Sequence, residues 1–187
     1  MERKKDEEYY PVCKNKNMIL EKNNNGDFRM NFTIIASQEN KYSIMDIIKE
    51  RQLYDLLYEL NKDITKTINI KLNENYLDDL EFIFVDLSDE NNVLDSDEEI
   101  IVNLQTKTVF IDANKCEIQG INIKNTSNTR DANVNINDFN ISVEMNKNVY
   151  DISLKFSILD DNIPEIIKMC IGLYLKKIFY KLKLYFE

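Results

Sequence analysis

The sequence predicts an α+β fold in which a curved antiparallel sheet of about six to eight strands is covered by a long C-terminal helix. Three observations lead to this prediction. Apolar residues recur at helical spacing over residues 44–61, and most of the chain from residue 64 to residue 158 then alternates with a period of two. The closing stretch, IPEIIKMCIGLYLKKIFYKLKLYFE, returns to a helical pattern.

Composition limits the class of protein. The 187 residues are 43% hydrophobic, which is enough apolar surface to fold a chain of this length. The net charge of −9 would repel a phosphate backbone, so we expect no nucleic-acid partner. Residues 1–26 are expected to be a polar, mobile N-terminal arm, and residues 27–187 a single α+β domain. The arm has no apolar run of signal-peptide length, so we expect a cytoplasmic protein.

The first elements of the domain follow from local patterns. Met30, Phe32 and Ile34 alternate with polar residues, which predicts a strand over 28–36 with one face in the core. A helix should follow over residues 44–61. Ser43 is its expected N-cap, with Asp46 at capping-box spacing.

The middle of the chain is expected to form strands, and its end a helix. Short polar connections separate the alternating runs between residues 64 and 158, which favours antiparallel neighbours. Pro164 and Glu165 suit the first turn of a helix over about residues 164–186. The longest apolar run of that helix, 169–175, is far shorter than the roughly 20 residues that cross a bilayer. We therefore expect no transmembrane segment and a helix packed on the sheet.

The residue types that support most catalysis are missing. The sequence has no histidine and three glycines, so it has no usual catalytic triad, no histidine metal site and no glycine-rich phosphate loop. The three cysteines are widely spaced and lack a Cys-x-x-Cys pair, so we expect reduced structural thiols rather than a metal site. We predict a protein that is not an enzyme and has no cofactor.

One stretch could recognise a partner through charge. DLSDENNVLDSDEE concentrates acidic residues but lacks the sixth-position glycine of a calcium loop. It is either a solvated loop or an acidic patch for a basic protein partner. The residues of this candidate patch are Asp86, Asp89, Glu90, Asp95, Asp97, Glu98 and Glu99.

Residues 107–187 resemble the last part of the N-terminal domain of heat-shock protein 90 ATPase activators. The matching pieces are TKTVFIDANKCEIQG, VNINDFNISVE, VYDISLKFSILDD and CIGLYLKKIF. The chain departs from that family because it lacks the tryptophans near the start and the short basic-glycine motif. The resemblance implies a non-enzymatic, co-chaperone-type protein that binds a heat-shock protein 90 chaperone.

The order of elements also resembles the START-like helix-grip fold: a strand over 28–36, a helix over 44–61, antiparallel strands and a long final helix. That resemblance implies an apolar ligand, such as a lipid or a quinone, held between the sheet and the last helix. Met169, Cys170, Leu173 and Ile178 are the candidate lining residues, unless they simply fill the core. A carrier of such a ligand is the alternative to the co-chaperone hypothesis, and a structural subunit of a larger complex is a third.

Overall fold

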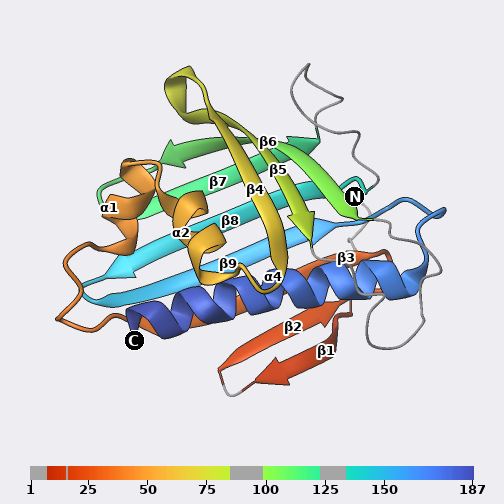
Figure 1. Ribbon diagram of the computed structural model, residues 1–187. Helices are drawn as coiled ribbons and strands as arrows, with labels where there is room; N and C mark the ends of the chain where they lie inside the picture. Colours follow the sequence, from red (N-terminus) through yellow and green to blue (C-terminus); the bar gives the residue numbers. More distant parts are fainter. Residues whose placement is uncertain (1–7, 16, 85–98, 123–133) are drawn as a thin grey trace, which may run out of the picture.

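The computed structural model describes residues 8–15, 17–84, 99–122 and 134–187 (Figure 1). In chain order its elements are β1 (Tyr10–Asn15), β2 (Met18–Lys22), β3 (Asp27–Ile35), α1 (Ile44–Lys49), α2 (Leu53–Leu60), β4 (Thr65–Leu72), the 3-10 helix η1 (Glu74–Tyr76), β5 (Leu77–Phe84), β6 (Ile100–Phe110), β7 (Lys115–Asn122), β8 (Asn137–Asn146), β9 (Val149–Ser157) and α4 (Glu165–Phe186).

The nine strands among the described residues form one antiparallel sheet in the order β1-β2-β3-β9-β8-β7-β6-β5-β4. Strand β3 pairs with the last strand, β9, and so joins the N-terminal hairpin of β1 and β2 to the rest of the sheet. Helix α4 runs across one face of the curved sheet, and α1 and α2 cover the same side beside it (Figure 1). We call this covered side the inner face. The predicted fold class is confirmed.

Alternating burial along the strands creates the inner face. In β3 the side chains of Phe28, Met30, Phe32 and Ile34 are buried, whereas Ile35 and the polar residues between them are more exposed. In strand β9 alternate side chains are also buried. Its inner residues are Tyr150, Ile152, Leu154 and Phe156. The period of two in the sequence therefore identified the buried side of these central strands.

The predicted helix over 44–61 is two short helices. The capping box is present, because Ser43 Oγ accepts from the backbone N–H of Asp46 and the Asp46 carboxylate accepts from the backbone N–H of Ser43. The break lies at Arg51, whose φ of 60° takes the backbone out of the helical region. The turn at Arg51 changes the direction of the chain between α1 and α2. It also points the guanidinium toward the sheet, where it contacts Asp78 of β5.

The N-terminal segment differs from the expected polar arm. Residues 10–15 and 18–22 are strands β1 and β2, and β2 pairs with β3. Met18 and Leu20 have 1% and 0% of their surface exposed. The short apolar run from Met18 to Leu20 is thus part of the core, because pairing of β2 with β3 turns Met18 and Leu20 to the inner face.

Candidate ligand-binding site

Helix α4 closes the inner face with one apolar side. Its buried apolar residues are Ile167, Ile171, Leu175, Ile178, Phe179, Leu182 and Phe186. The ring of Phe179 packs on Phe32 of β3 with 6.1 Å between centroids. The contact between α4 and the sheet is therefore mainly apolar, although Lys168, Lys176 and Lys183 of the helix are also buried.

The helix packs closely on the sheet at Gly172. A Cβ at this position would lie 3.0 Å from Cε1 of Phe28 and 3.2 Å from Cδ2 of Leu20. Phe28 in turn stacks on Phe156 of β9, with centroids 4.9 Å apart. This side of α4 is thus seated directly on β2 and β3, with little room for anything between them.

The other side of α4 meets a row of aromatic rings. Tyr174 stacks on Phe84 of β5 with 5.1 Å between centroids. Phe84 stacks on Phe82 at 6.3 Å, and Phe82 meets the edge of Tyr54 from α2 at 6.4 Å. We call Tyr54, Phe82, Phe84 and Tyr174 the aromatic row. It leads from α4 along the inner face to a buried polar group.

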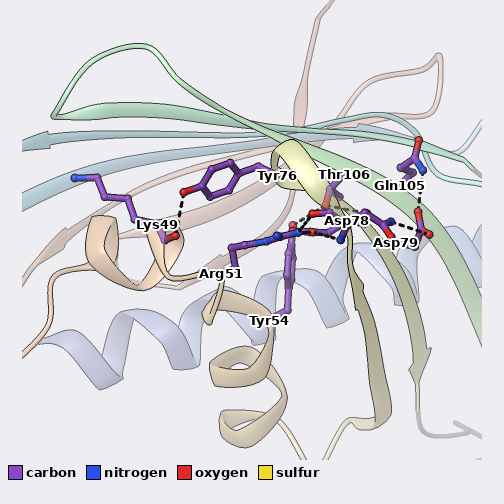
Figure 2. Close-up of polar contacts among 9 residues, drawn as sticks. Lys49, Arg51, Tyr54, Tyr76, Asp78, Asp79, Gln105 and Thr106 are labelled. Atoms are coloured by element: carbon purple, nitrogen blue, oxygen red, sulfur yellow. Dashed lines mark hydrogen bonds and ion pairs between the residues drawn. The ribbon is translucent and has the colours of Figure 1, made fainter.

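That polar group lies where α2 crosses β5 and β6 (Figure 2). The Tyr54 hydroxyl donates to Thr106 Oγ1 at 3.3 Å, and the Thr106 hydroxyl donates to the carbonyl oxygen of Asp78 at 3.4 Å. Burial raises the pKa of Tyr54 to about 12. The phenol therefore stays neutral near pH 7 and acts as a hydrogen-bond donor or acceptor rather than as a base.

Arg51 supplies the charge of this polar group. Its guanidinium donates to the carboxylate of Asp78 and to the carbonyl oxygen of Asn73, the latter at 2.6 Å, and lies 5.5 Å from the ring of Tyr76. Among the residues that the structure describes, its Nε is buried and has no hydrogen-bond partner. The ion pair is thus neutral as a unit and retains one unused N–H donor. We call Arg51, Tyr54, Asp78 and Thr106 the polar end of the inner face.

Asp63, in the connection from α2 to β4, forms ion pairs with two lysines of α4. Its carboxylate pairs with Lys177 at 3.0 Å and with Lys181. Hydrogen bonds from these two ammonium groups, with that of Lys181 the stronger cause, lower the pKa of Asp63 to about 2. The carboxylate is therefore charged at all physiological pH values, and α4 is tied to the α2–β4 connection.

A groove of about 480 Å³ lies on the outer face of the sheet, away from α4. It is lined mostly by polar residues of β3, β8 and β9, with one residue of the β1–β2 turn. The lining residues are Asn17, Asn31, Phe32, Thr33, Ser142, Glu144, Asp151, Ile152 and Ser153. Thr33 donates to Asp151 at 2.7 Å, and Glu144 pairs with Lys115 at 3.2 Å. This groove does not match the apolar site expected beneath the last helix.

The four residues predicted to line an apolar cavity do not share one environment. Ile178 is on the buried side of α4, and Met169 and Cys170 are half-buried. Leu173 has 40% of its surface exposed and lies on the side of α4 away from the sheet. Sequence reasoning instead missed Tyr54, Phe84 and Arg51, whose roles depend on contacts between distant segments.

The predicted acidic patch falls mostly outside the described residues. Asp86, Asp89, Glu90, Asp95, Asp97 and Glu98 lie in that part of the chain. Glu99 is described and forms an ion pair with Lys66 of β4.

The cysteines are free thiols, as the sequence predicts. Within the described ranges, no three acidic or cysteine side chains gather as they would around a metal ion. No helix among these residues is long and apolar enough to cross a membrane.

Comparisons with known proteins identify the fold. No family model and no curated protein matches the sequence. Among solved structures, human StAR-related lipid transfer protein 5 superposes with a TM-score of 0.66 at 4% identity, over 98% of this chain and 88% of that one. The lipid transfer and protein localization domain of human StarD13 gives 0.63 at 6% identity, over 97% and 90%.

A bacterial structure agrees with these two. A STAR-related lipid transfer protein fragment from Xanthomonas axonopodis gives a TM-score of 0.61 at 8% identity, over 94% of each chain. At such low identity the comparisons show a shared fold, the START-like helix-grip fold that the order of elements predicts. The resemblance of residues 107–187 to heat-shock protein 90 activators is not shown.

Proposed function

We propose that this chain is a non-enzymatic binding domain that holds an elongated apolar molecule between the inner face of the sheet and α4. The fold is that of three proteins whose names describe lipid transfer, which supports this proposal over a co-chaperone role. The aromatic row carries the argument, because it connects the underside of α4 to a buried polar group by ring contacts of 5.1 to 6.4 Å. An apolar chain or ring system would gain by stacking along it.

The polar end determines which head group would fit. Arg51 is already neutralised by Asp78, so a second carboxylate on the ligand would be poorly balanced there. The unused Nε–H of Arg51 requires a hydrogen-bond acceptor, and the neutral hydroxyls of Tyr54 and Thr106 lie nearby. We therefore propose a ligand with one uncharged oxygen at its end, a hydroxyl or a carbonyl.

The ligand would reach the inner face by displacement of α4 on the side of the aromatic row. The opposite side is fixed by the contact of Gly172 with Phe28 and by a 2.6 Å hydrogen bond from Lys183 Nζ to the carbonyl oxygen of Thr33. On the side of the row, α4 is held by half-exposed ion pairs to Asp63. Such pairs contribute only about 0–1 kcal/mol each, so this edge opens more readily.

Native mass spectrometry of the purified chain, followed by solvent extraction, tests the proposal. We expect a bound apolar molecule, and after its removal saturable binding of a fluorescent long-chain alcohol. Tyr174→Ala should weaken that binding, whereas Ile121→Ala, on the outer face and 62% exposed, should not. Absence of both a copurified ligand and saturable binding would exclude the carrier role. Recovery of a heat-shock protein 90 chaperone by the ligand-free chain would instead support the co-chaperone hypothesis.

A further inference from the structure

A bulge in the edge strand β1 turns Cys13 toward α4. The register between β1 and β2 shifts between Pro11 and Cys13, which leaves Val12 as the additional residue of the bulge. Cys13 is then directly opposite Leu20, and opposite residues of antiparallel strands point to the same face. Because Leu20 packs under α4 at Gly172, the thiol of Cys13 also points to the helix.

Lys176 of α4 meets this thiol from the other side. Its Nζ donates a hydrogen bond to Sγ of Cys13 at 3.0 Å, and only 3% of the residue surface is exposed. Other lysines of α4 have carboxylate partners: Lys177 and Lys181 pair with Asp63. Among the described residues, Lys176 has the Cys13 thiol in place of a carboxylate.

This arrangement places a hydrogen-bond donor with a positive charge against the sulfur of Cys13. The ammonium can therefore stabilise negative charge that develops on this sulfur while it reacts. A cysteine beside a lysine ammonium is the setting in which protein thiols become nucleophiles. Cys13 is also half-buried rather than closed off, so a small molecule can reach it from the edge of the sheet.

We propose that Cys13 and Lys176 form a reactive thiol site that is alkylated by small α,β-unsaturated carbonyl compounds. Sγ of Cys13 attacks the β-carbon and forms a C–S bond, while the electron pair of the C=C bond moves to the carbonyl oxygen. The ammonium of Lys176 stabilises the negative charge of the resulting enolate, the proton that left the sulfur goes to water, and the α-carbon takes up a proton from water. The product contains every atom of both reactants, so neither an oxidant nor a reductant is needed.

The other two thiols provide internal comparisons. Cys170 is half-buried like Cys13, but it lies on a different side of α4, and burial raises the pKa of its thiol. Cys116 is fully buried, with its sulfur 3.9 Å from Sδ of Met45, and burial raises its pKa to about 11. Exposure alone would give Cys13 and Cys170 similar rates, whereas the ammonium should separate them.

Labelling of the full chain with limiting N-ethylmaleimide, followed by peptide mapping over time, tests the site. We expect Cys13 to react about tenfold faster than Cys170, and Cys116 to react last. Equal rates at Cys13 and Cys170 would overturn the proposal.

Two lysine variants then test the ammonium. Lys176→Met should slow labelling of Cys13 about tenfold while leaving Cys170 unchanged. Lys168→Met is the matched control, because this lysine of α4 is also buried, at 8% exposed, and should leave the rate at Cys13 unchanged. An unchanged Cys13 rate in folded Lys176→Met would contradict the proposal. If that variant fails to fold by circular dichroism, the ratio of Cys13 to Cys170 labelling in the unaltered chain decides.

Discussion

Gly172 of α4 rests directly on the ring of Phe28, so that a Cβ at residue 172 would lie 3.0 Å from Cε1 of that ring. Phe28 cannot easily yield, because it is 1% exposed and stacks on Phe156. The absence of a side chain therefore sets how closely the helix approaches the sheet. Glycine usually weakens a helix interior by about 1 kcal/mol relative to alanine, and here the close contact offsets that loss.

Replacement of Gly172 by valine should push α4 away from β2 and β3. We expect a loss of about 2 kcal/mol in the free energy of unfolding, because overpacking of a closed contact typically costs about 1–3 kcal/mol. Urea unfolding followed by circular dichroism measures this loss. Leu173→Ala, at the exposed neighbouring position, is the control and should change stability much less. A Gly172→Val protein as stable as the parent would show that α4 is not seated at this point.

Leu20→Ala tests whether the N-terminal hairpin belongs to the core. The side chain is fully buried against α4, so its truncation should cost about 2–5 kcal/mol, as for other buried leucines. Ile19→Ala removes the neighbouring apolar side chain, which is half-buried, and should cost clearly less. Thermal melts compare the two variants with the parent. Equal, small changes in both would restore the interpretation of residues 1–26 as a mobile arm.

The hairpin illustrates what sequence patterns miss. The central strands were predictable because Phe28, Met30, Phe32 and Ile34 alternate without interruption. In β1 and β2 the buried residues are few, charged residues surround them, and Val12 breaks the alternation as a bulge. Their place in the sheet depends on pairing with β3, which is a tertiary contact that no local pattern contains.

The sequence also did not predict which side of α4 faces the sheet. The residues from Met169 to Leu175 are nearly all apolar, so more than one side of the helix has residues at core spacing. The sequence favoured a side that contains Leu173, whereas the buried side contains Ile171, Leu175 and Phe179. The helix and its length were predictable, but the side that faces the sheet is decided by fit against Phe28 and Phe84.

Asp63→Asn tests the edge at which we propose that α4 opens. The variant loses both ion pairs, and we expect a decrease of about 1 kcal/mol or less in the free energy of unfolding near pH 6, because the groups are half-exposed. Glu59→Gln removes a single exposed pair with Lys62, three positions along the chain, and should change stability less than Asp63→Asn, which loses two pairs. Urea unfolding at low and high salt measures these differences, and the effect of Asp63→Asn should shrink at high salt.

The same pair of proteins gives a pH dependence with a defined sign. The folded-state pKa of Asp63 is lowered from 3.8 to about 2. The ion pairs of Asp63 therefore add to the free energy of unfolding above pH 4, and this stabilisation is lost as the pH falls toward 2. The difference in stability between the parent and Asp63→Asn should therefore narrow over that window. A difference that stays constant from pH 6 to pH 2 would contradict the ion pairs.

The contact of Arg51 with Asp78 joins residues that are 27 positions apart, and neither residue stands out in the sequence. The guanidinium is 23% exposed and the carboxylate 4% exposed, so removal of one partner leaves a charge that water cannot readily solvate. We expect Arg51→Met to lower the free energy of unfolding by about 3–5 kcal/mol, as for other broken buried pairs. Lys115→Met, which breaks an exposed pair with Glu144, is the control and should change stability by less than about 1 kcal/mol.

A second substitution separates loss of the pair from loss of packing. In Arg51→Met/Asp78→Leu no charge remains buried, so the double variant should be more stable than Arg51→Met alone. A double-mutant cycle from urea unfolding measures the coupling between the two positions. A coupling near zero would mean that the two side chains do not form an ion pair in the folded protein. The polar end proposed for the ligand would then lack its neutral ion pair, and a charged head group would become the better candidate.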